Sequence, residues 1–394
     1  MENIQTTTSL NRSLQRAIDE SPRFQPALPL LGGHGQTILG HFLPAPPVSE
    51  EFRDPRKIKL ALPDGDELWG REYAPLGKQD PKALVHIFHG LAGSSDSKYM
   101  PRAAAACVEL GLSAVLWNHR GCGDGRHRAI GTYHSGRSDD LARAVQWGRQ
   151  NFPNRPQIII GYSLSGNAAI LLSAGIVPAH SATQLSRLEI QNQFNGDLPD
   201  FVIAVSPPFD LYLSALRLSR KGSRLYGQRF MFDLIECLND REAIGADKLA
   251  GHSSRADDFF RLQEIAKSAS RQIRPWDSVL QFDRLYTGPA GGFEDHMDYY
   301  RRASSGQALG QQLLPLVILT ADDDPITNGL SDVTIEQRNA DHHSFVIDRQ
   351  THGGHMGFVD RELLKRPTAV AKRWMERRLQ LYLAHYLKMY LAKN

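Results

Sequence analysis

The chain has 394 residues, enough for one large core with an insertion or for two domains. Hydrophobic residues make up 41% and charged residues 23%, proportions that exclude a largely disordered or fibrous chain. The 46 basic and 43 acidic residues give a formal charge of +3, and no dense basic block is present. Nucleic acid is therefore not an expected partner.

The cysteines and the N-terminus both bear on cellular location. Cys107, Cys122 and Cys237 are odd in number and lack CxxC spacing, which favours reduced thiols in a cytosolic setting over a disulfide framework or a zinc site. The polar N-terminus lacks the apolar segment of a secretory signal. No apolar run approaches the roughly 18 residues that a membrane-spanning helix needs. We therefore expect a soluble, cytoplasmic protein, with peripheral membrane contact left open.

The N-terminal part precedes the regular pattern of the chain. Residues 1–50 are expected to form an extension packed on the core, with a short helix near 10–18 and then a stretch punctuated by proline and glycine. The strand-like runs 57–62 and 67–74 flank an Asp-Gly-Asp turn. These two runs predict a hairpin at the start of the core.

Short apolar runs rich in β-branched residues alternate with helical candidates in the rest of the chain. The runs are 83–89, 112–117, 157–162, 200–206, 314–320 and 343–349. The helical candidates between them include 100–110, 138–150 and 166–174. This alternation predicts the α/β class, with a mostly parallel central sheet that is buried on both faces and flanked by helices.

One long segment interrupts the alternation. Residues 208–312 are helical in character and rich in arginine, which predicts an insertion and a candidate lid. The core would then comprise residues 51–207 and 313–394. Its last segment, 373–394, carries Leu and Tyr at helical spacing. Such an apolar stripe favours docking on the core, with a helix on a membrane surface as the alternative.

The segment after the run 157–162 carries the most informative motif. Gly161, Ser163 and Ser165 follow a strand and precede a helix, the pattern of a nucleophile elbow. Residues two before and two after the nucleophile must be small, because neighbouring backbone crowds them. Gly161 meets this need, whereas Ser165 stands where the usual pattern has glycine. A simple helix cap after a strand is the alternative, and Ser163 is our candidate nucleophile.

A glycine turn follows the run 83–89 and offers backbone donors. Acyl transfer places negative charge on the former carbonyl oxygen, and each fixed N–H group there contributes about 3 to 4 kcal/mol. The N–H groups of Leu91 and Leu164 are the candidates for this oxyanion hole. An ordinary turn is the alternative for the residues around Leu91.

Carboxylates follow the run 314–320, at the strand end where ligand sites of open α/β sheets lie. We select Asp324 as the acid that orients a histidine, with Asp323 as the fallback. Aspartates that only shape an acidic turn are the alternative. The glycine-rich loop 351–358 then holds His355, which as a neutral imidazole can take the serine proton.

Metal and cofactor sites are not expected. His352 and His355 beside the aspartates could be metal ligands, but HxxH in a glycine loop lacks the helical spacing of zinc hydrolases. The chain has neither a dinucleotide-binding GxGxxG arrangement nor a phosphate-binding loop. The order Ser, Asp, His along the chain is that of the α/β-hydrolase fold.

Seven segments together resemble a known family. They are GGHGQTI (32–38), FHGLAGSS (88–95), WNHRGCG (117–123), GYSLSGN (161–167), VSPPFDL (205–211), DDP (323–325) and GGHMGF (353–358). The chain resembles the YheT-like esterases and their abhydrolase-domain relatives within the α/β-hydrolase superfamily. The resemblance implies hydrolysis of short- or medium-chain acyl esters or acylglycerol-type lipids, with Ser163, Asp324 and His355 as the catalytic triad.

Two other functions stay open at this point. An acyltransferase on the same scaffold would share the chemistry up to the acyl-enzyme and then use an alcohol in place of water. A non-catalytic binding protein on a hydrolase scaffold is the second alternative, and it is motivated by Ser165 at the crowded elbow position. A small-molecule ester or lipid is the expected ligand in each case, and the oligomeric state is undetermined.

Overall fold

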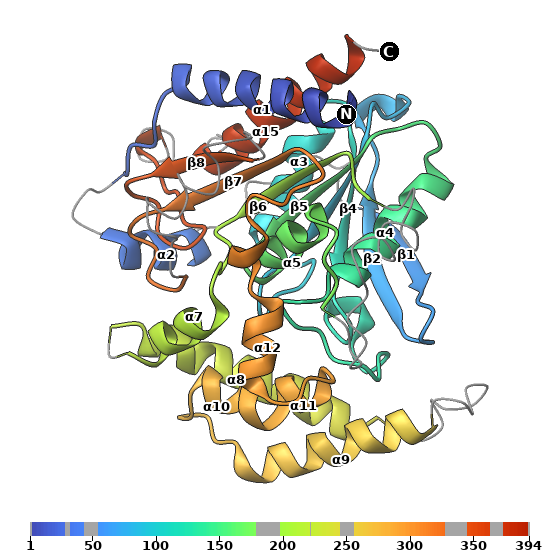
Figure 1. Cartoon of the computed structure of the whole chain (residues 1–394), viewed down its shortest axis with the longest axis vertical. Helices are drawn as coiled ribbons and strands as arrows, with labels where there is room; N and C mark the ends of the chain where they lie inside the picture. Colours follow the sequence, from blue (N-terminus) through green and yellow to red (C-terminus); the bar gives the residue numbers. More distant parts are fainter. Residues whose placement is uncertain are drawn as a thin grey trace.

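An eight-stranded sheet forms the centre of the protein (Figure 1). The computed structural model describes residues 2–27, 32–42, 54–178, 198–220, 222–244, 256–327, 345–362 and 373–392. The strands are β1 (Arg56–Ala61), β2 (Glu67–Tyr73), β3 (Leu84–Phe88), β4 (Ser113–Asn118), β5 (Gln157–Tyr162), β6 (Phe201–Val205), β7 (Leu316–Ala321) and β8 (Val346–Gln350). Their order is β1-β2-β4-β3-β5-β6-β7-β8, with β2 antiparallel to β1 and β4 and the other pairs parallel. Every predicted strand is present, and the α/β class is confirmed.

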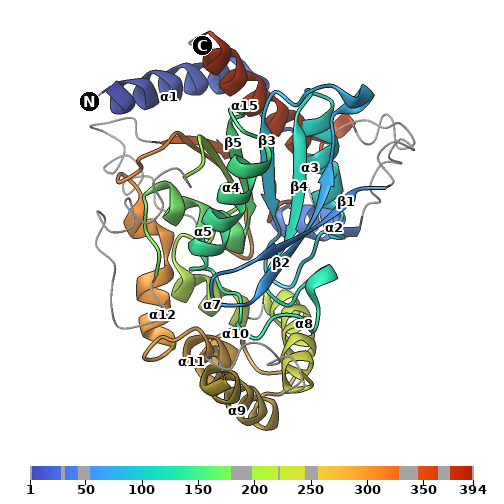
Figure 2. The same ribbon diagram turned by 90° about the vertical axis from the view of Figure 1, so that its right-hand side faces the viewer.

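Helices cover both faces of this sheet (Figures 1 and 2). One face carries α1 (Glu2–Glu20), α3 (Tyr99–Val108) and α15 (Trp374–Leu391), and the other carries α4 (Ser138–Asn151) and α5 (Leu164–Ser173). Side chains alternate along each strand, so Val85 and Ile87 of β3 pack on the first face while Leu84 and Phe88 pack on the second. The sheet is thus buried on both sides, as its apolar strands require.

Helix α1 is longer than the sequence indicated. A short helix near residues 10–18 was expected, whereas α1 runs from Glu2 to Glu20. Leu10, Leu14 and Ile18 are buried at a spacing of four residues and form one stripe that faces α15 and β8. Tertiary packing of that stripe stabilises turns whose own polar sequence predicts little helix.

The stretch 32–42 is a helix and not the irregular segment that its glycines suggested. This helix, α2 (Gly32–Phe42), contains four glycines, which individually disfavour a helix. Close packing explains two of them, because a Cβ on Gly33 would lie 1.6 Å from the carbonyl oxygen of Asp323. A Cβ on Gly40 would lie 2.6 Å from Cα of Gly357. Contact with distant loops therefore outweighs local propensity here.

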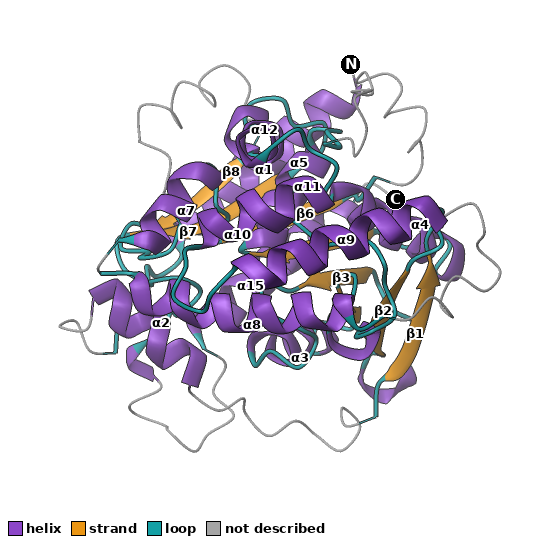
Figure 3. Ribbon diagram, turned by 90° about the horizontal axis from the view of Figure 1, so that it is seen from below, coloured by secondary structure: helices purple, strands orange, loops and turns teal. Residues whose placement is uncertain are grey.

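The segment between β6 and β7 is helical. It comprises α7 (Leu211–Ser219), α8 (Arg224–Glu242), α9 (Ala256–Gln272), α10 (Val279–Phe282), the π-helical turn η7 (Asp283–Thr287), α11 (Gly288–Ala290) and α12 (His296–Ala303). A short 3₁₀ turn, η8 (Ser305–Ala308), follows α12 in this segment, and two others lie earlier in the chain, η3 (Leu76–Lys78) and η4 (Gly123–Gly125). The helices α7 to α12 gather at one end of the sheet, and several of them share a separate apolar cluster (Figures 1 and 3).

The apolar stripe of the C-terminal segment lies in the core. Leu379, Leu383, Tyr386 and Leu387 of α15 are buried against the sheet and α3, while Leu391 at the helix end is exposed. None of the helices in the described ranges combines the length and the apolar character that crossing a bilayer demands. The face that would have to contact a membrane surface is thus occupied by the protein itself.

Candidate active site

A strained turn holds Ser163 at the carboxyl end of β5. Ser163 has φ 50° and ψ −114°, a backbone conformation that residues other than glycine rarely adopt. Its N–H donates to the carbonyl of Val205 at 2.8 Å, and its carbonyl accepts from Asn167 N–H at 3.1 Å. A Cβ on Gly161 would lie 2.4 Å from the carbonyl oxygen of Ser165, so only glycine fits there. The short strand-to-helix connection therefore has the geometry of a nucleophile elbow.

Three side chains from distant loops form a hydrogen-bonded row. His355 Nε2 lies 2.9 Å from Ser163 Oγ, and His355 Nδ1 lies 2.8 Å from Asp324 Oδ2. Asp324 also accepts from the N–H groups of Ile326 at 2.8 Å and Thr327 at 2.9 Å, and from the Thr327 hydroxyl at 2.8 Å. A carboxylate only accepts, so Nδ1 of His355 carries the proton and Nε2 faces the serine as an acceptor.

The carboxyl of Asp324 is held in its ionised form. Burial alone would raise its pKa, but the charge of His355 and the hydrogen bonds from His355, Ile326 and Thr327 outweigh burial and lower the pKa below its ordinary value. An ionised carboxylate can stabilise an imidazolium on His355 during proton transfer. The row is thus arranged for general base catalysis on the Ser163 hydroxyl.

The neighbouring aspartate has a different set of contacts. Asp323 accepts from Gly354 N–H at 2.8 Å, and its other oxygen lies 3.3 Å from Nδ1 of His352. His352 and His355 therefore face different carboxylates and do not share a ligand site. In the described residues Asp323 fixes the loop that carries His355 instead of contacting the His355 ring.

Helix α2 supports the histidine loop, a role that the sequence did not reveal. His355 N–H donates to Thr37 Oγ1 at 2.8 Å, and that hydroxyl donates to the carbonyl of Gly33 at 2.7 Å. Gln36 Oε1 accepts from Val359 N–H at 2.7 Å. The sequence feature that could have indicated this role is the glycine-rich segment 32–42, because glycines allow two backbone segments to approach closely.

Two backbone N–H groups beside the cavity make no hydrogen bond to any described residue, one in the loop after β3 and one in the turn at Ser163. Gly90 N–H donates to the Tyr99 hydroxyl at 2.9 Å, and Ala92 N–H donates to the Tyr133 hydroxyl at 3.1 Å. Across the described parts of the chain, no hydrogen bond engages the N–H of Leu91 or of Leu164. Both leucines line the same cavity as Ser163. The flanking tyrosines thus hold the loop while these two donors stay free for a ligand.

Ser165, at the usual glycine position, is fully accommodated. Its hydroxyl donates to the carbonyl of His89 and lies 2.6 Å from Nε2 of His119, and all three side chains are buried. Ser165 therefore links the elbow to the loop that contains Leu91. The departure from glycine that seemed to disturb the elbow instead adds a hydrogen-bonded connection.

We expect Ser165→Ala to lower the free energy of unfolding by about 1 to 3 kcal/mol, because a buried carbonyl and a ring N–H would lose their partner. Ser173→Ala is the matched control on the same helix. Among the described residues the Ser173 hydroxyl bonds to the carbonyl of Ile170 alone, and this carbonyl also accepts a backbone N–H, so the loss should be below about 1 kcal/mol. Urea unfolding measures both. Equal losses would contradict the linking role of Ser165.

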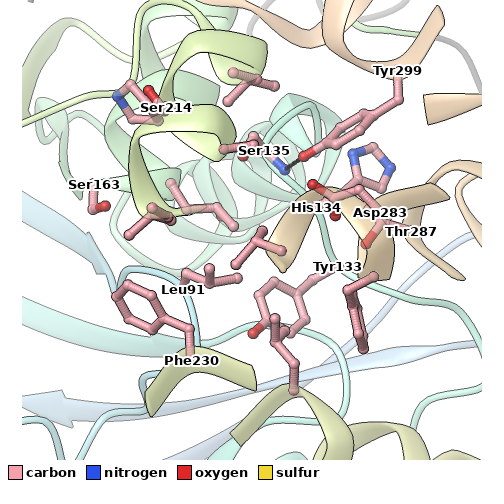
Figure 4. A pocket seen from close by; sticks show the side chains of 18 of the residues that line it. Leu91, Tyr133, His134, Ser135, Ser163, Ser214, Phe230, Asp283, Thr287 and Tyr299 are labelled. Atoms are coloured by element: carbon pink, nitrogen blue, oxygen red, sulfur yellow. Dashed lines mark hydrogen bonds between the residues drawn. The ribbon is translucent and has the colours of Figure 1, made fainter. Parts of the chain in front are cut away.

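A cavity extends from Ser163 into the helical insertion (Figure 4). It encloses about 890 Å³ of empty space, including solvent at its opening. Apolar side chains from the core and from the helices between β6 and β7 form a large part of its wall, beside side chains that carry hydroxyl groups. The apolar side chains are Leu91, Leu164, Pro208, Leu211, Ala215, Leu218, Phe230, Leu234, Val279, Phe282 and Ile326. Such a wall suits an apolar chain attached to a group that reacts at Ser163.

Asp283 contributes an acidic group to this cavity, and no motif in the sequence indicated it. Its carboxylate accepts from the Tyr300 hydroxyl at 2.8 Å and from the Thr287 side chain. Burial raises the pKa of Asp283 from 3.8 to about 6, against the opposing effect of these two hydrogen bonds. In Figure 4 Asp283 and Ser163 lie on opposite sides of the cavity.

We expect Asp283→Asn to become more stable relative to the wild type as the pH rises from 4 to 7. The pKa of Asp283 is higher in the folded than in the unfolded protein, so between about pH 4 and 6 the native wild type binds more protons than the unfolded chain does. The wild type therefore loses stability as the pH rises and the proton dissociates. The amide does not titrate. The difference in unfolding free energy should grow by up to about 3 kcal/mol, as measured by urea unfolding at each pH. A difference that stays constant with pH would contradict the raised pKa.

Known proteins resemble the chain over most of its length. It is 29% identical over 333 residues to the putative esterase YheT of Escherichia coli, an alignment that covers 84% of this chain and 85% of YheT. It is 30% identical over 294 residues to the monoacylglycerol lipase of Saccharomyces cerevisiae, and this alignment covers 73% of this chain and 57% of the lipase.

A second yeast protein and a family match add to this. The medium-chain fatty acid ethyl ester synthase/esterase 2 of Saccharomyces cerevisiae is 24% identical, over 71% of this chain and 58% of its own length. The chain thus spans little more than half of either yeast relative. The family described as serine aminopeptidase, S33, matches residues 79–184, which include the loop after β3 and the turn at Ser163.

Proposed function

Because the chain belongs to the YheT-like esterases of the α/β-hydrolase superfamily, we propose that it hydrolyses carboxylic esters through Ser163, His355 and Asp324. The observation that carries the proposal is the row in which His355 lies 2.9 Å from Ser163 Oγ and 2.8 Å from Asp324 Oδ2. Those contacts are within hydrogen-bond reach, as a nucleophile, its base and the orienting acid require.

The reaction proceeds in two acyl transfers. Ser163 Oγ attacks the ester carbonyl while His355 Nε2 takes the hydroxyl proton, and the N–H groups of Leu91 and Leu164 stabilise the oxyanion. The C–O bond to the alcohol then breaks, and His355 returns the proton to the leaving oxygen. Water, deprotonated by His355, attacks the acyl-enzyme and releases the acid and the Ser163 hydroxyl. Asp324 stabilises the imidazolium in both halves.

The cavity and the relatives both support a proposal for the substrate class. Relatives named as a putative esterase, a monoacylglycerol lipase and a medium-chain fatty acid ethyl ester synthase/esterase support ester substrates, and we propose short- or medium-chain acyl esters or acylglycerol-type lipids. The mostly apolar wall of the cavity suits an acyl chain. We assign the helices between β6 and β7 the role of a lid, since residues of α7, α8 and α10 roof this cavity.

An acyltransferase is the second candidate. A relative named as both synthase and esterase of ethyl esters favours it, because an alcohol can replace water in attacking the same acyl-enzyme. Product analysis in the presence of ethanol separates the two, since transfer yields a new ethyl ester while hydrolysis yields the free acid.

A fluorophosphonate probe tests the nucleophile directly. We expect the probe to label the folded wild type and to leave Ser163→Ala unlabelled, because only an activated serine attacks phosphorus at a useful rate. Mass spectrometry of the labelled peptide identifies the modified residue. Ser173→Ala, which removes a buried serine away from the cavity, should label like the wild type. Failure to label a folded wild type would contradict the proposal, and it would favour a non-catalytic binding protein.

A further inference from the structure

The wall of the cavity opposite Ser163 is built on an unusual backbone turn. Asp283 begins the π-helical turn η7, and Asp283, Tyr286 and Thr287 of this turn all line the cavity. A π-helical turn hydrogen-bonds from i to i+5 and is rare, and such turns occur frequently at functional sites. The turn brings a carboxyl and two hydroxyl-bearing side chains to the same wall, and Tyr300 of α12 adds a third hydroxyl.

The carboxyl of Asp283 has hydroxyl partners but no cationic partner. Among the described residues no ion pair includes Asp283, and the groups that act on it are Tyr300 and Thr287. A buried carboxylate without a cation is costly, and an apolar side chain would fill the same space without that cost. Arg241 also lines the cavity, but its guanidinium donates to the backbone carbonyls of Arg120 and of residues 129–131. The presence of an unpaired carboxylate in this wall is therefore best explained by a ligand that brings a hydrogen-bond donor.

The positions of Ser163 and Asp283 define the shape of that ligand. They lie on opposite sides of the cavity (Figure 4). Apolar side chains such as Leu164 and Phe282 also line it. An ester bound for attack at Ser163 would extend an apolar chain across this space. The far end of the chain would then meet the carboxyl of Asp283.

Building on the proposed function, we propose that the preferred substrates are esters whose acyl chain ends in a hydroxyl or ammonium group, and that Asp283 binds this terminal donor. Asp283 thereby acts as a specificity-determining residue, remote from the bond that is cleaved. An acyl chain that ends in a methyl group would place no donor at the carboxyl, which would lose solvent without gaining a partner.

Binding to a catalytically inert variant tests this inference without turnover. We choose Ser163→Ala and titrate it at pH 8 with ethyl octanoate and its ω-hydroxy and ω-amino derivatives, together with shorter and longer homologues, using isothermal titration calorimetry. At the chain length that spans the cavity, we expect the ω-substituted esters to bind about tenfold more tightly than the methyl-terminated ester.

Second substitutions assign the preference to Asp283. Adding Asp283→Leu should abolish the preference for both ω-substituted esters. Adding Asp283→Asn should abolish it for the ω-amino ester and reduce it for the ω-hydroxy ester, because the amide oxygen still accepts but carries no charge. Asp258→Asn, which removes an exposed carboxylate from α9, is the matched control and should leave all three affinities unchanged.

Two results would overturn the inference. One is equal binding of the three esters at every chain length, and the other is a preference that survives Asp283→Leu. If the leucine variant does not fold, the asparagine variant tests the inference instead. A preference for the ω-amino ester that persists without the negative charge of Asp283 would then overturn the inference. Failure of the proposed function is seen separately, as absence of fluorophosphonate labelling in the wild type.

Discussion

Ser163→Ala and His355→Ala are each expected to lower kcat for a chromogenic ester by about 10⁵- to 10⁶-fold, and the double replacement is expected to lower it no further. The two groups act as one unit, since the hydroxyl is a poor nucleophile without the base and the base has no role without the hydroxyl. Their contact of 2.9 Å between Nε2 and Oγ is the structural basis of this expectation. Initial rates on a chromogenic ester series measure it.

His352→Ala is the matched control for the histidine replacement. His352 lies in the same loop, but its side chain is 48% exposed and its ring faces Asp323. Its loss should change kcat by less than about tenfold, because the ring touches neither Ser163 nor Asp324. Additive losses in the double variant of Ser163 and His355 would show that the two groups act independently and would contradict the proposed mechanism.

The fold and the row of three groups were largely predictable because their signals are local. Each strand of the parallel sheet is an apolar run, and Ser163, Asp324 and His355 each follow such a run within a few residues. Since parallel strands end at the same edge of the sheet, their order along the chain was enough to predict the convergence. Gly161 marked the sharp turn in the same local way, because no larger residue fits beside the backbone of Ser165.

What the sequence missed depends on contacts between distant segments. Glycines in α2 indicated an irregular stretch, and only the positions of Asp323 and Gly357 explain why the helix has glycine at positions 33 and 40. Asp283 lies in a helical region with no motif, and its chemistry arises from burial beside Tyr300 and the opening of the cavity. The burial of a side chain and the close packing of distant segments arise only in the folded chain, so a local sequence pattern does not predict them.

The sequence favoured Asp324 and kept Asp323 as the fallback, and the structure places Asp324 against the His355 ring. The distinction between these two aspartates leads to the second large effect. We expect Asp324→Asn to lower kcat by about 10⁴-fold and Asp323→Asn by less than about tenfold. Both replacements remove one charge from the same loop, so they are matched to each other. The difference lies in the contact with the His355 ring, which Asp324 makes at 2.8 Å and Asp323 does not.

Two backbone N–H groups determine which end of the side-chain amide of an asparagine at position 324 would face His355. The N–H groups of Ile326 and Thr327 donate to Oδ1 of Asp324, so the amide oxygen of an asparagine would occupy that position. Its NH₂ group would then take the place of Oδ2 and point at Nδ1 of His355. A donor there forces Nδ1 to accept and moves the ring proton to Nε2, which can no longer take the proton of Ser163.

Asparagine at position 323 keeps its main contact, because the amide oxygen can still accept from Gly354 N–H and hold the loop. Kinetics on both variants, with urea unfolding to verify that each is folded, measure the difference. A larger loss of kcat for Asp323→Asn than for Asp324→Asn would mean that the histidine loop moves during catalysis and that the neighbouring carboxylate orients the base. The hydrogen bonds of Asp324 to Ile326 and Thr327 would then serve only to shape the turn.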